Sequence, residues 1–411
     1  MYNLYMKSKK VLFLEASGGG GHISITTAII QALNKKNPDI QTQRADVMPP
    51  LAHKLYQVAS RQFVNAFALL YKATDNHRSE LITAKLNSLI SREKLTKIIL
   101  ESNADLIFSN YALAIAGIPK ILEKIDKPIP FIVFIPDPFT VHNIYLSKKA
   151  NSTLVSTLAV YQLAINNGIL PQQLEITGHP IREEFIKTPE DTKLLKKQLG
   201  LDPDIFTILF GGSGHGAEKT LEILIHLGAR PSGNLIKRLI RLTNLDYKTY
   251  YKLFFRIFKR QHKNIPPFQA ICVCGDNTEL KEELELLEYP SYIKPFVYLK
   301  ADNMAELMHA SNLIVAKAGP NILFESIATG KPFLATYHIK GQEDGNIDLI
   351  KYAQLGFSEK NPQNTAHLIE IILKNKELLN HTRPGISFIR NTQNDAAAKI
   401  ANHILKYLNK T

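Results

Sequence analysis

The feature that most constrains the fold is an alternation of short apolar segments with helical segments, which runs through the chain twice. Strands that alternate with helices form parallel sheets covered on both faces, so the apolar segments predict buried strands. These segments are five to seven residues long, each is followed by a stretch with helical spacing, and they occupy residues 11–16, 105–109, 131–136, 205–210, 269–275, 292–297, 313–318 and 332–336.

A charged linker at 181–204 separates the two rounds of alternation. With 411 residues, the chain has the length of two domains rather than one. We therefore expect two doubly wound α/β domains facing a cleft, an N-terminal one of residues 1–180 and a C-terminal one of residues 181–390. A last segment, 391–411, has apolar residues at helical spacing.

Glycine-rich loops follow the first strand of each half. Gly18–Gly21 precedes the first helix, and Gly211–Gly216 stands at the corresponding place in the second half. Glycines there let the backbone approach a ligand closely, and a helix N-terminus favours an anion. The first loop is neither a Walker loop nor the spaced dinucleotide fingerprint. A plain tight turn is the alternative for the first loop, but four consecutive glycines exceed what a turn requires.

Other sequence features exclude several classes of protein. Cys272 and Cys274 are one residue apart, which fits neither a redox pair nor a zinc site, so we expect two reduced structural thiols. No run approaches 18 uncharged apolar residues, and Val11–Leu14 is too short for a signal peptide, so we expect a cytoplasmic or peripheral protein. Asp202-Pro203-Asp204 precedes a strand, and we interpret it as a solvated turn rather than a metal site.

The net charge of +13 is concentrated in residues 230–263, which hold ten Lys or Arg and one acidic residue, Asp246. Basic residues recur every four positions from Lys248 to Arg260, so they share a helical face, and Phe and Tyr fill the rest. Such a helix fits an anionic membrane surface. A solvated helix pair is the alternative. Nucleic acid is not expected, because no binding motif accompanies the charge. The residues expected at the membrane are Lys237, Arg241, Lys248, Lys252, Arg256, Lys259 and Arg260.

The motifs that follow the two loops resemble a known family. Together with Gly19–His22 and Gly211–Gly216, the series is similar to the monogalactosyldiacylglycerol synthase and diacylglycerol glucosyltransferase group, which is related to the peptidoglycan GlcNAc transferase. The motifs that carry this resemblance are Gly178-His179-Pro180-Ile181-Arg182, Lys317-Ala318-Gly319-Pro320, Glu325, Gly330-Lys331-Pro332 and Gly341-Gln342-Glu343-Asp344-Gly345-Asn346.

The resemblance implies a GT-B fold of two Rossmann-like domains, with the donor in the C-terminal domain, the acceptor in the N-terminal domain, and the last helix crossing back to the N-terminal domain. In that family, the residue at Glu325 holds the ribose hydroxyls, backbone at Phe296 and Val297 meets the uracil, and Gln342 and Glu343 reach the sugar. The residues expected at the donor are Gly211, Gly212, Ser213, Gly214, His215, Phe296, Val297, Gly319, Pro320, Asn321, Glu325, Gln342, Glu343 and Asn346, and Gly19, Gly20 and Gly21 form the acceptor-side loop.

The resemblance also implies an inverting, metal-independent transfer, which needs a base for the acceptor hydroxyl and a stabilised UDP leaving group. His22, at the start of the first helix, is our first candidate for the base, although it could instead only cap the turn. Asp137, which follows a strand, is the second, acting directly or orienting a histidine such as His142. Loop amides and helix N-termini can stabilise the leaving group, so no metal and no cofactor besides the UDP-sugar substrate are expected.

We therefore expect a hexosyltransferase that moves glucose or galactose from a UDP-sugar to diacylglycerol, bound peripherally at the cytoplasmic face of the cell membrane. Two alternatives remain open. One is a UDP-GlcNAc transferase with another lipid-linked acceptor. The other is a non-catalytic, membrane-associated sugar-nucleotide-binding protein, favoured by Asn321-Ile322 where the family has Gly-Thr.

Overall fold

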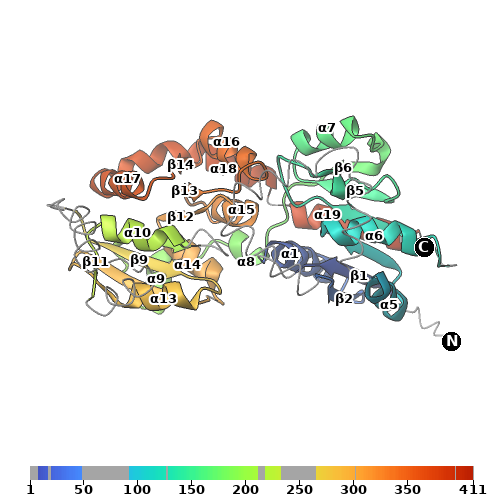
Figure 1. The fold of residues 1–411 in the computed structure, drawn as a ribbon, viewed down its shortest axis with the longest axis horizontal. Coiled ribbons are helices and arrows are strands. Elements are labelled where there is room, and N and C mark those ends of the chain that lie inside the picture. Colours follow the sequence, from blue (N-terminus) through green and yellow to red (C-terminus); the bar gives the residue numbers. More distant parts are fainter. Residues whose placement is uncertain are drawn as a thin grey trace, which may run out of the picture. The chain divides into compact units, whose positions relative to one another are not determined.

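The structure, a computed structural model, contains two compact units (Figure 1). The first comprises Met1–Ile186, Ile339–Asn346 and Asn391–Thr411, and the second comprises Lys187–His338 and Ile347–Arg390. The residues that the structure describes are 8–16, 20–48, 92–125, 128–211, 218–232, 265–300, 302–393 and 395–410.

A six-stranded, wholly parallel sheet forms the centre of the first unit, with the strand order β2-β1-β3-β4-β5-β6. Its elements, in chain order, are β1 (Lys10–Glu15), α1 (Gly21–Lys36), β2 (Gln41–Asp46), α5 (Arg92–Ser102), β3 (Leu106–Ser109), α6 (Ala112–Leu122), β4 (Phe131–Phe134), the 3₁₀ helix η1 (Asn143–Tyr145), β5 (Ser152–Val155), α7 (Leu158–Asn166), the 3₁₀ helix η2 (Pro171–Gln173), β6 (Leu174–Ile176) and α8 (Glu183–Ile186).

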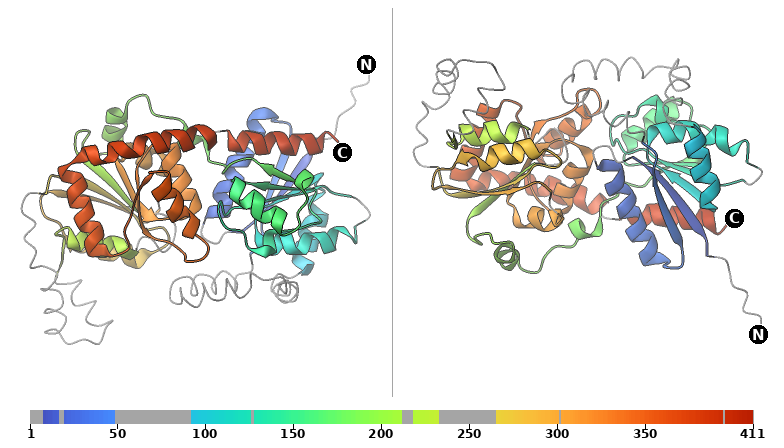
Figure 2. Two further views of the ribbon diagram at one scale, coloured as in Figure 1. Left: turned by 90° about the horizontal axis from the view of Figure 1, so that it is seen from above. Right: turned by 60° about the horizontal axis from the view of Figure 1, so that its bottom comes forward.

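Both faces of this sheet are buried, because successive side chains of a strand point to opposite faces. Leu12 and Leu14 pack with residues of α5, α6 and α7, whereas Val11 and Phe13 pack with residues of α1 and of α19 (Ala396–Leu408). The C-terminal helix α19 thus lies beside α1 on one face of the first sheet (Figures 1 and 2). Burial on both faces explains why β1 is a continuous apolar run.

The second unit repeats the architecture with the strand order β11-β9-β7-β12-β13-β14, again wholly parallel. A small antiparallel pair, β8 with β10, lies apart from this sheet. The elements are α9 (Thr192–Gln198), β7 (Phe206–Gly211), α10 (Glu218–His226), β8 (Arg230–Pro231), β9 (Phe268–Val273), α13 (Thr278–Glu285), β10 (Leu287–Glu288), β11 (Ile293–Tyr298), α14 (Met304–Ala310), β12 (Leu313–Lys317), α15 (Pro320–Ala328), β13 (Phe333–Tyr337), α16 (Asp344–Tyr352), β14 (Gly356–Ser358), α17 (Pro362–Lys374), the 3₁₀ helix η3 (Lys376–Thr382) and α18 (Arg383–Gln393).

Two doubly wound parallel sheets are what the alternation predicts, and this fold class is confirmed. The cysteines also lie as expected: Cys272 and Cys274 are free, buried thiols, and burial raises the pKa of Cys274 to about 11. Asp202 accepts a hydrogen bond from the backbone N–H of Asp204 (3.1 Å), which makes this motif the predicted turn.

Two details differ from the sequence-based expectations. Residues 181–186 and 339–346 group with the first unit, although we placed both within 181–390, and residues 339–346 contact the loop that follows β4. The last segment, 391–411, which we expected to form one helix, instead contains the end of α18 and a separate helix α19. Within the parts of the chain that the structure describes, no helix is both long and apolar enough to cross a membrane. The expected membrane residues, from Lys237 to Arg260, lie outside those parts.

Candidate functional site

The first candidate half-site lies at the carboxyl ends of β1 and β3. The chain passes from β1 to β2 on one side and then to β3 on the other, so the strand order reverses between these strands. In open α/β sheets, ligands bind at the carboxyl ends of strands at such a switch point. Gly20 precedes α1 with a φ of 74°, a left-handed conformation that glycine adopts at little cost. This turn places Gly21 and His22 in the first turn of α1.

Asn110, directly after β3, holds the backbone at His22. Its side-chain Nδ2 donates to the carbonyl of His22 (3.0 Å) and to Oγ1 of Thr26 (3.3 Å). The ring of Tyr111 meets the imidazole edge to face, with 5.6 Å between the ring centroids. Among the described residues, no hydrogen-bond partner reaches Nδ1 of His22 or Oδ1 of Asn110, although both atoms are buried. Buried polar atoms without a partner are costly, so these two are suited to a ligand that supplies one.

The imidazole of His22 is neutral at physiological pH. Burial lowers the pKa of His22 to about 4. The polar backbone and side-chain groups of Asn110 and the negative charge of Asp46 act in the opposite direction. A neutral imidazole has a lone pair that can accept a proton, which a general base requires. A base with so low a pKa is weak, and an anion bound near the ring would strengthen it by raising the pKa.

This pKa shift predicts a pH dependence of stability. The folded-state pKa of His22 lies below its ordinary value of 6.5, so the unfolded chain takes up the proton first as the pH falls. We expect the unfolding free energy to be unaffected by this residue above pH 6.5 and to fall between about pH 6.5 and 4, by at most about 3 kcal/mol.

The measurement is urea denaturation of the wild-type protein and of His22→Gln across that pH range. The difference between the two curves isolates His22, because the other titrating groups are common to both proteins. Equal pH slopes for the two proteins would show that the imidazole is not desolvated.

An ion pair ties the first turn of α1 to the sheet. Arg44 on β2 makes a bidentate contact with Glu15 at the end of β1, at 2.8 and 3.0 Å. The same guanidinium donates to Oγ1 of Thr27 (3.0 Å) and to the carbonyl of Ile23 (3.3 Å). Bidentate arginine contacts fix geometry as well as adding energy. Arg44 therefore fixes where α1 begins, and with it the position of His22.

Asp137, the second candidate base, follows β4, which lies two strands from β1 in the sheet. Its carboxylate is buried and accepts from Nε2 of Gln342, at 3.2 Å to Oδ1 and 3.4 Å to Oδ2. Oγ1 of Thr140 donates to the backbone carbonyl of Gln342 (2.7 Å). The structure thus brings together Asp137 and Gln342, which we expected to act on the acceptor and the donor sugar respectively.

The remaining residues of this motif shape the loop after β13. The carboxylate of Glu343 is buried and accepts from the backbone N–H of Ile339 (2.6 Å). Asn346, also buried, donates its backbone N–H to the carbonyl of Glu343 (3.1 Å). A Cβ on Gly345 would lie 2.3 Å from Cβ of Phe139, so only glycine fits there. One carboxylate oxygen of Glu343 therefore stabilises the loop by accepting the hydrogen bond from Ile339. Its contact with the sugar stays a prediction.

The second candidate half-site lies at the carboxyl ends of β7 and β12. The strand order of the second sheet reverses between them, since β9 and β11 lie on one side of β7 and β12 on the other. Gly211 ends β7 with a φ of 130°, and a Cβ there would lie 2.3 Å from the carbonyl oxygen of Val273. Gly212–His215 of the same loop lie outside the described residues. Gly211 is therefore required by the close approach of β9.

The N-terminus of α15 opens toward the same edge. Gly319 is its extended N-cap, which has no side chain to cap the helix, and Pro320 is its first residue. The first backbone N–H groups of a helix have no partner within the helix, and the helix dipole favours an anion there. The α15 N-terminus, which includes Asn321, can therefore receive a phosphate group.

Glu325, Phe296 and Val297 complete the expected donor residues. Glu325 lies on α15 and is 8 % exposed. Phe296 and Val297 are half-buried near the end of β11, which is the edge strand of the sheet and pairs with β9. The predicted contacts with ribose and uracil stay predictions.

Gly178-His179, by contrast, has a structural role in this protein. Gly178 has a φ of 91°, and a Cβ there would lie 2.7 Å from Oε1 of Gln393. The same oxygen accepts from the backbone N–H of His179 (2.7 Å), whose ring nitrogen Nδ1 lies 3.4 Å from Oγ of Ser156. The hydrogen bond between His179 and Gln393 thus holds the end of α18 against the loop that follows β6.

Asn110 and Asp46 are residues of the first half-site that the sequence analysis missed. Asn110 directly follows the apolar run that we expected to be a strand, which is the signal that could have identified it. Asp46 ends β2, a strand without an apolar run, and the sequence gives no comparable signal for it.

The comparisons with known proteins agree with the geometry. Residues 22–181 match the sequence model of the monogalactosyldiacylglycerol (MGDG) synthase family, and residues 249–344 match that of the glycosyltransferase family 28 C-terminal domain. A probable chloroplastic monogalactosyldiacylglycerol synthase of Glycine max is 26 % identical over 88 % of this chain, which spans 65 % of that protein's length. A processive diacylglycerol beta-glucosyltransferase of Staphylococcus carnosus is 22 % identical over 91 % of this chain and 87 % of its own length.

Solved structures show the same fold at low sequence identity. MurG of Acinetobacter baumannii superimposes with a TM-score of 0.54 at 14 % identity, over 97 % of this chain and 99 % of its own. MnaA of S. aureus, solved with UDP, gives 0.58 at 14 %, over 98 % and 97 %. The resemblance inferred from the sequence motifs is confirmed. These findings show that the chain has a GT-B fold, in which residues 22–181 are similar to the monogalactosyldiacylglycerol synthase family and residues 249–344 are similar to the glycosyltransferase family 28 C-terminal domain.

Proposed function

We propose that this protein transfers glucose or galactose from a UDP-sugar to the free hydroxyl of diacylglycerol, with inversion at the anomeric carbon. The observation that carries the proposal is the match of residues 22–181 to the monogalactosyldiacylglycerol synthase family. That stretch contains the residues proposed to act on the acceptor. They are the candidate bases His22 and Asp137, and Asn110, which holds the backbone at His22.

The second unit would hold the UDP-sugar. Its support is the switch point between β7 and β12, where Gly211 and the N-terminus of α15 lie at one edge of the sheet. Structures of similar fold have been solved with UDP or with UDP and glucose, namely MnaA of S. aureus and HepE of Anabaena. The amides at the start of α15 would take the diphosphate, and Glu325 would accept hydrogen bonds from the ribose hydroxyls.

The proposed reaction is a displacement in one step. The acceptor oxygen forms a bond to the anomeric carbon as the bond between that carbon and the UDP oxygen breaks. His22 takes the proton of the acceptor hydroxyl, and UDP leaves with the electron pair. The positive end of the α15 dipole stabilises the developing charge on UDP, which is the work a divalent cation does in metal-dependent enzymes. The proposal therefore assigns no metal and no cofactor.

Asp137 is the alternative base. The amide of Gln342 holds its carboxylate in place, so its orientation is fixed before the acceptor binds. In this alternative, His22 would position the acceptor through its unpartnered Nδ1 rather than take the proton.

The protein would work on the surface of the cytoplasmic membrane, since its acceptor is a membrane lipid. The support is the cluster of basic and aromatic residues between 230 and 263. Near an anionic leaflet, each basic residue contributes about 1 kcal/mol to membrane binding. Nucleic acid is not among the proposed partners.

The proposal is tested with purified protein, diacylglycerol in mixed micelles, and radiolabelled UDP-glucose, UDP-galactose or UDP-GlcNAc supplied one at a time. We expect label from UDP-glucose or UDP-galactose to enter the lipid phase only when diacylglycerol is present. Label that enters lipid from UDP-GlcNAc alone would favour the GlcNAc transferase alternative. Tight UDP binding without transfer from any donor would favour a non-catalytic protein.

The donor half of the proposal predicts the effect of Glu325→Ala. Loss of a charged acceptor for two ribose hydroxyls should weaken UDP binding by about 1–3 kcal/mol, which isothermal titration calorimetry measures. Glu222→Ala is the matched control, because Glu222 is an exposed residue of α10 in the same unit and its loss changes the net charge equally. Equal UDP affinity for the two variants would remove Glu325 from the site.

A further inference from the structure

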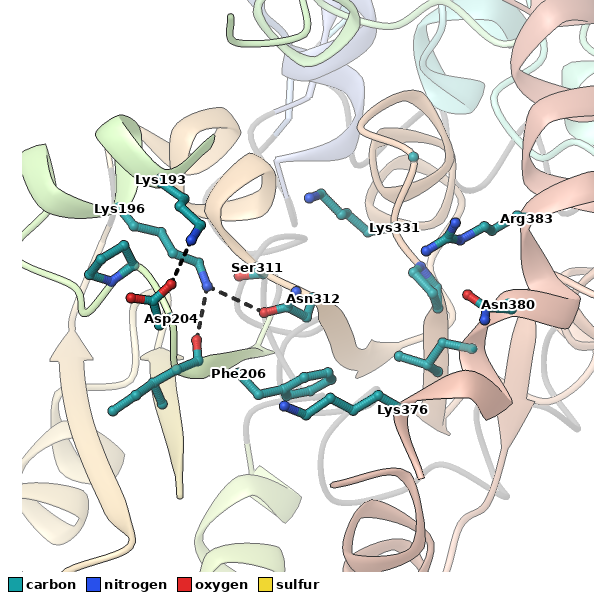
Figure 3. A pocket seen from close by; sticks show the side chains of 15 residues that line it. Lys193, Lys196, Asp204, Phe206, Ser311, Asn312, Lys331, Lys376, Asn380 and Arg383 are labelled. Atoms are coloured by element: carbon teal, nitrogen blue, oxygen red, sulfur yellow. Dashed lines mark hydrogen bonds and ion pairs between the residues drawn. The ribbon is translucent and has the colours of Figure 1, made fainter. Parts of the chain in front are cut away.

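A cavity of about 420 Å³ lies at the opposite edge of the second sheet from the proposed donor site (Figure 3). Its lining includes Phe206 at the start of β7, Asn312 just before β12, and Pro332 just before β13. These are the amino ends of the strands, whereas the glycine loop and the N-terminus of α15 follow carboxyl ends. The volume lies in the range of small-molecule sites, roughly 300–1,000 Å³. The cavity is therefore large enough for a ligand and separate from the donor edge.

The lining is strongly cationic. Five basic side chains contribute to it against one carboxylate, that of Asp204. Asp204 is already paired with the exposed Lys193 at 2.7 Å. The five basic side chains come from α9, the segment after α15, η3 and α18, and they are Lys193, Lys196, Lys331, Lys376 and Arg383.

Lys196 is buried and Lys331 is half-buried, and among the described residues neither has a carboxylate in hydrogen-bond contact. Nζ of Lys196, a residue that is 5 % exposed, donates to the carbonyl of Ile205 (2.9 Å) and to Oδ1 of Asn312 (3.4 Å). Nζ of Lys331 donates to the carbonyl of His309 (2.7 Å). Each ammonium has three N–H donors, so these contacts leave one donor on Lys196 and two on Lys331.

The charge of these ammonium groups is poorly compensated. Burial and, to a smaller extent, the nearby charge of Lys196 together lower the pKa of Lys331 to about 8. Burial also lowers the pKa of Lys196, with Asp202 and Asp204 opposing and Lys376 and Lys193 adding to the decrease. An anion between the ammonium groups would reverse both effects by supplying the missing countercharge.

Lys331 also has a structural role, because it donates to a carbonyl in the last turn of α14. That role does not account for the exposed cations at the rim. In Figure 3, Lys331, Lys376 and Arg383 extend from different segments around the cavity. Nζ of Lys376 lies 5.7 Å from the ring centroid of Phe206, and within the described part of the chain neither Lys376 nor Arg383 forms an ion pair.

We propose that this cavity binds a phosphate-bearing anion, as a site separate from that of the sugar nucleotide. Lys196 and Lys331 would contact the phosphate oxygens on the inner side of the cavity. Lys376 and Arg383 would contact the same phosphate group at the rim. Lysine and arginine are the residues that recognise phosphate, the latter with paired donors. The cavity exceeds what a bare phosphate fills, so the ligand is a phosphate ester whose remainder occupies the rest. α15 runs from the donor edge to this cavity, since Gly319 precedes it and Gly330 follows it.

The test uses the full chain and a double variant at the rim, Lys376→Gln with Arg383→Gln, because both side chains are exposed and their loss should spare the fold. The matched control is Lys374→Gln with Lys197→Gln, two exposed lysines of the same unit that do not line the cavity. Titrations are made with saturating UDP, so that the donor site does not compete for phosphate.

Two probes distinguish the source of the phosphate. Inorganic phosphate is titrated by calorimetry, and vesicles that contain phosphatidylglycerol are tested by co-sedimentation, with each variant compared with the control. Binding of inorganic phosphate that weakens about tenfold in the rim variant alone supports a soluble phosphate ester. No binding of inorganic phosphate, but vesicle binding that weakens in the rim variant alone, supports a lipid headgroup. Equal binding by both variants with both probes overturns the proposal.

Discussion

His22→Ala should lower the turnover of UDP-hexose by roughly 10²–10⁴-fold while the Kd for UDP changes little, because the imidazole is proposed to take the acceptor's proton. His22 starts α1 at the switch point of the first sheet, and its ring is neutral because burial lowers its pKa to about 4. UDP would be held by the second unit, so its affinity reports whether the variant protein is intact.

Two further variants make this result interpretable. Asp137→Asn keeps the size of the side chain and an oxygen for Gln342, but it removes the carboxylate's basicity. His367→Ala is the matched control, since His367 is an exposed histidine of α17 in the second unit. If His22→Ala keeps full activity and Asp137→Asn loses it, the assignment of the base is reversed.

Replacing residues 233–263 with a short Gly/Ser linker should abolish binding to anionic vesicles and leave UDP binding in place. The segment carries nine Lys or Arg against one Asp. The replacement starts after Ser232 because Arg230 and Pro231 form β8, which pairs with β10. Wild-type binding should weaken as salt rises, since the Debye length falls from about 10 Å at 0.1 M to about 3 Å at 1 M. Co-sedimentation at low and high salt measures both effects.

A second variant separates charge from packing in this segment. Changing Lys248, Lys252, Arg256 and Arg260 to Gln keeps the length of the segment and removes the charges of one predicted helical face. Activity on diacylglycerol in vesicles should then fall far more than activity on diacylglycerol in detergent. A lower melting temperature with an equal loss of both activities would show that the segment is a packed structural element. Vesicle binding equal to that of the wild type would overturn its membrane role.

The strands formed by an apolar run were predictable from sequence, whereas short or polar strands such as β2 and β5 were not. β1 and β4 contain continuous apolar runs because helices cover both sides of them. β2 is an edge strand with mostly polar, partly exposed side chains, so nothing in its composition marks it as a strand. We expected the last helical segment to be continuous because its apolar residues keep one helical spacing throughout. Helix boundaries, however, depend on local capping, which the apolar spacing does not indicate.

The candidate site was predictable where a motif lies on one loop and not where distant segments meet. His22, Gly211 and Gly319 could be placed because each follows an apolar strand run. The hydrogen bond of Gln342 to Asp137 joins residues 205 positions apart, and no periodicity encodes that pairing. The cationic cavity was missed for the same reason, since its basic side chains come from separate elements of the second unit.

The fold alone does not specify the reaction. A structure described as a UDP-GlcNAc 2-epimerase of Neisseria meningitidis superimposes on this chain with a TM-score of 0.55. An epimerase changes the sugar nucleotide itself, whereas a transferase consumes it and forms a glycolipid. The nature of the product therefore separates the two reactions.

Product analysis by NMR tests the central claim most directly. The protein is incubated with UDP-glucose or UDP-galactose, diacylglycerol and EDTA, and both the lipid phase and the aqueous phase are examined. We predict a monohexosyl diacylglycerol with a β-configured anomeric centre, formed from the α-linked donor in step with the release of UDP. A product of α configuration, a changed sugar nucleotide in the absence of lipid, or free hexose alone would contradict it.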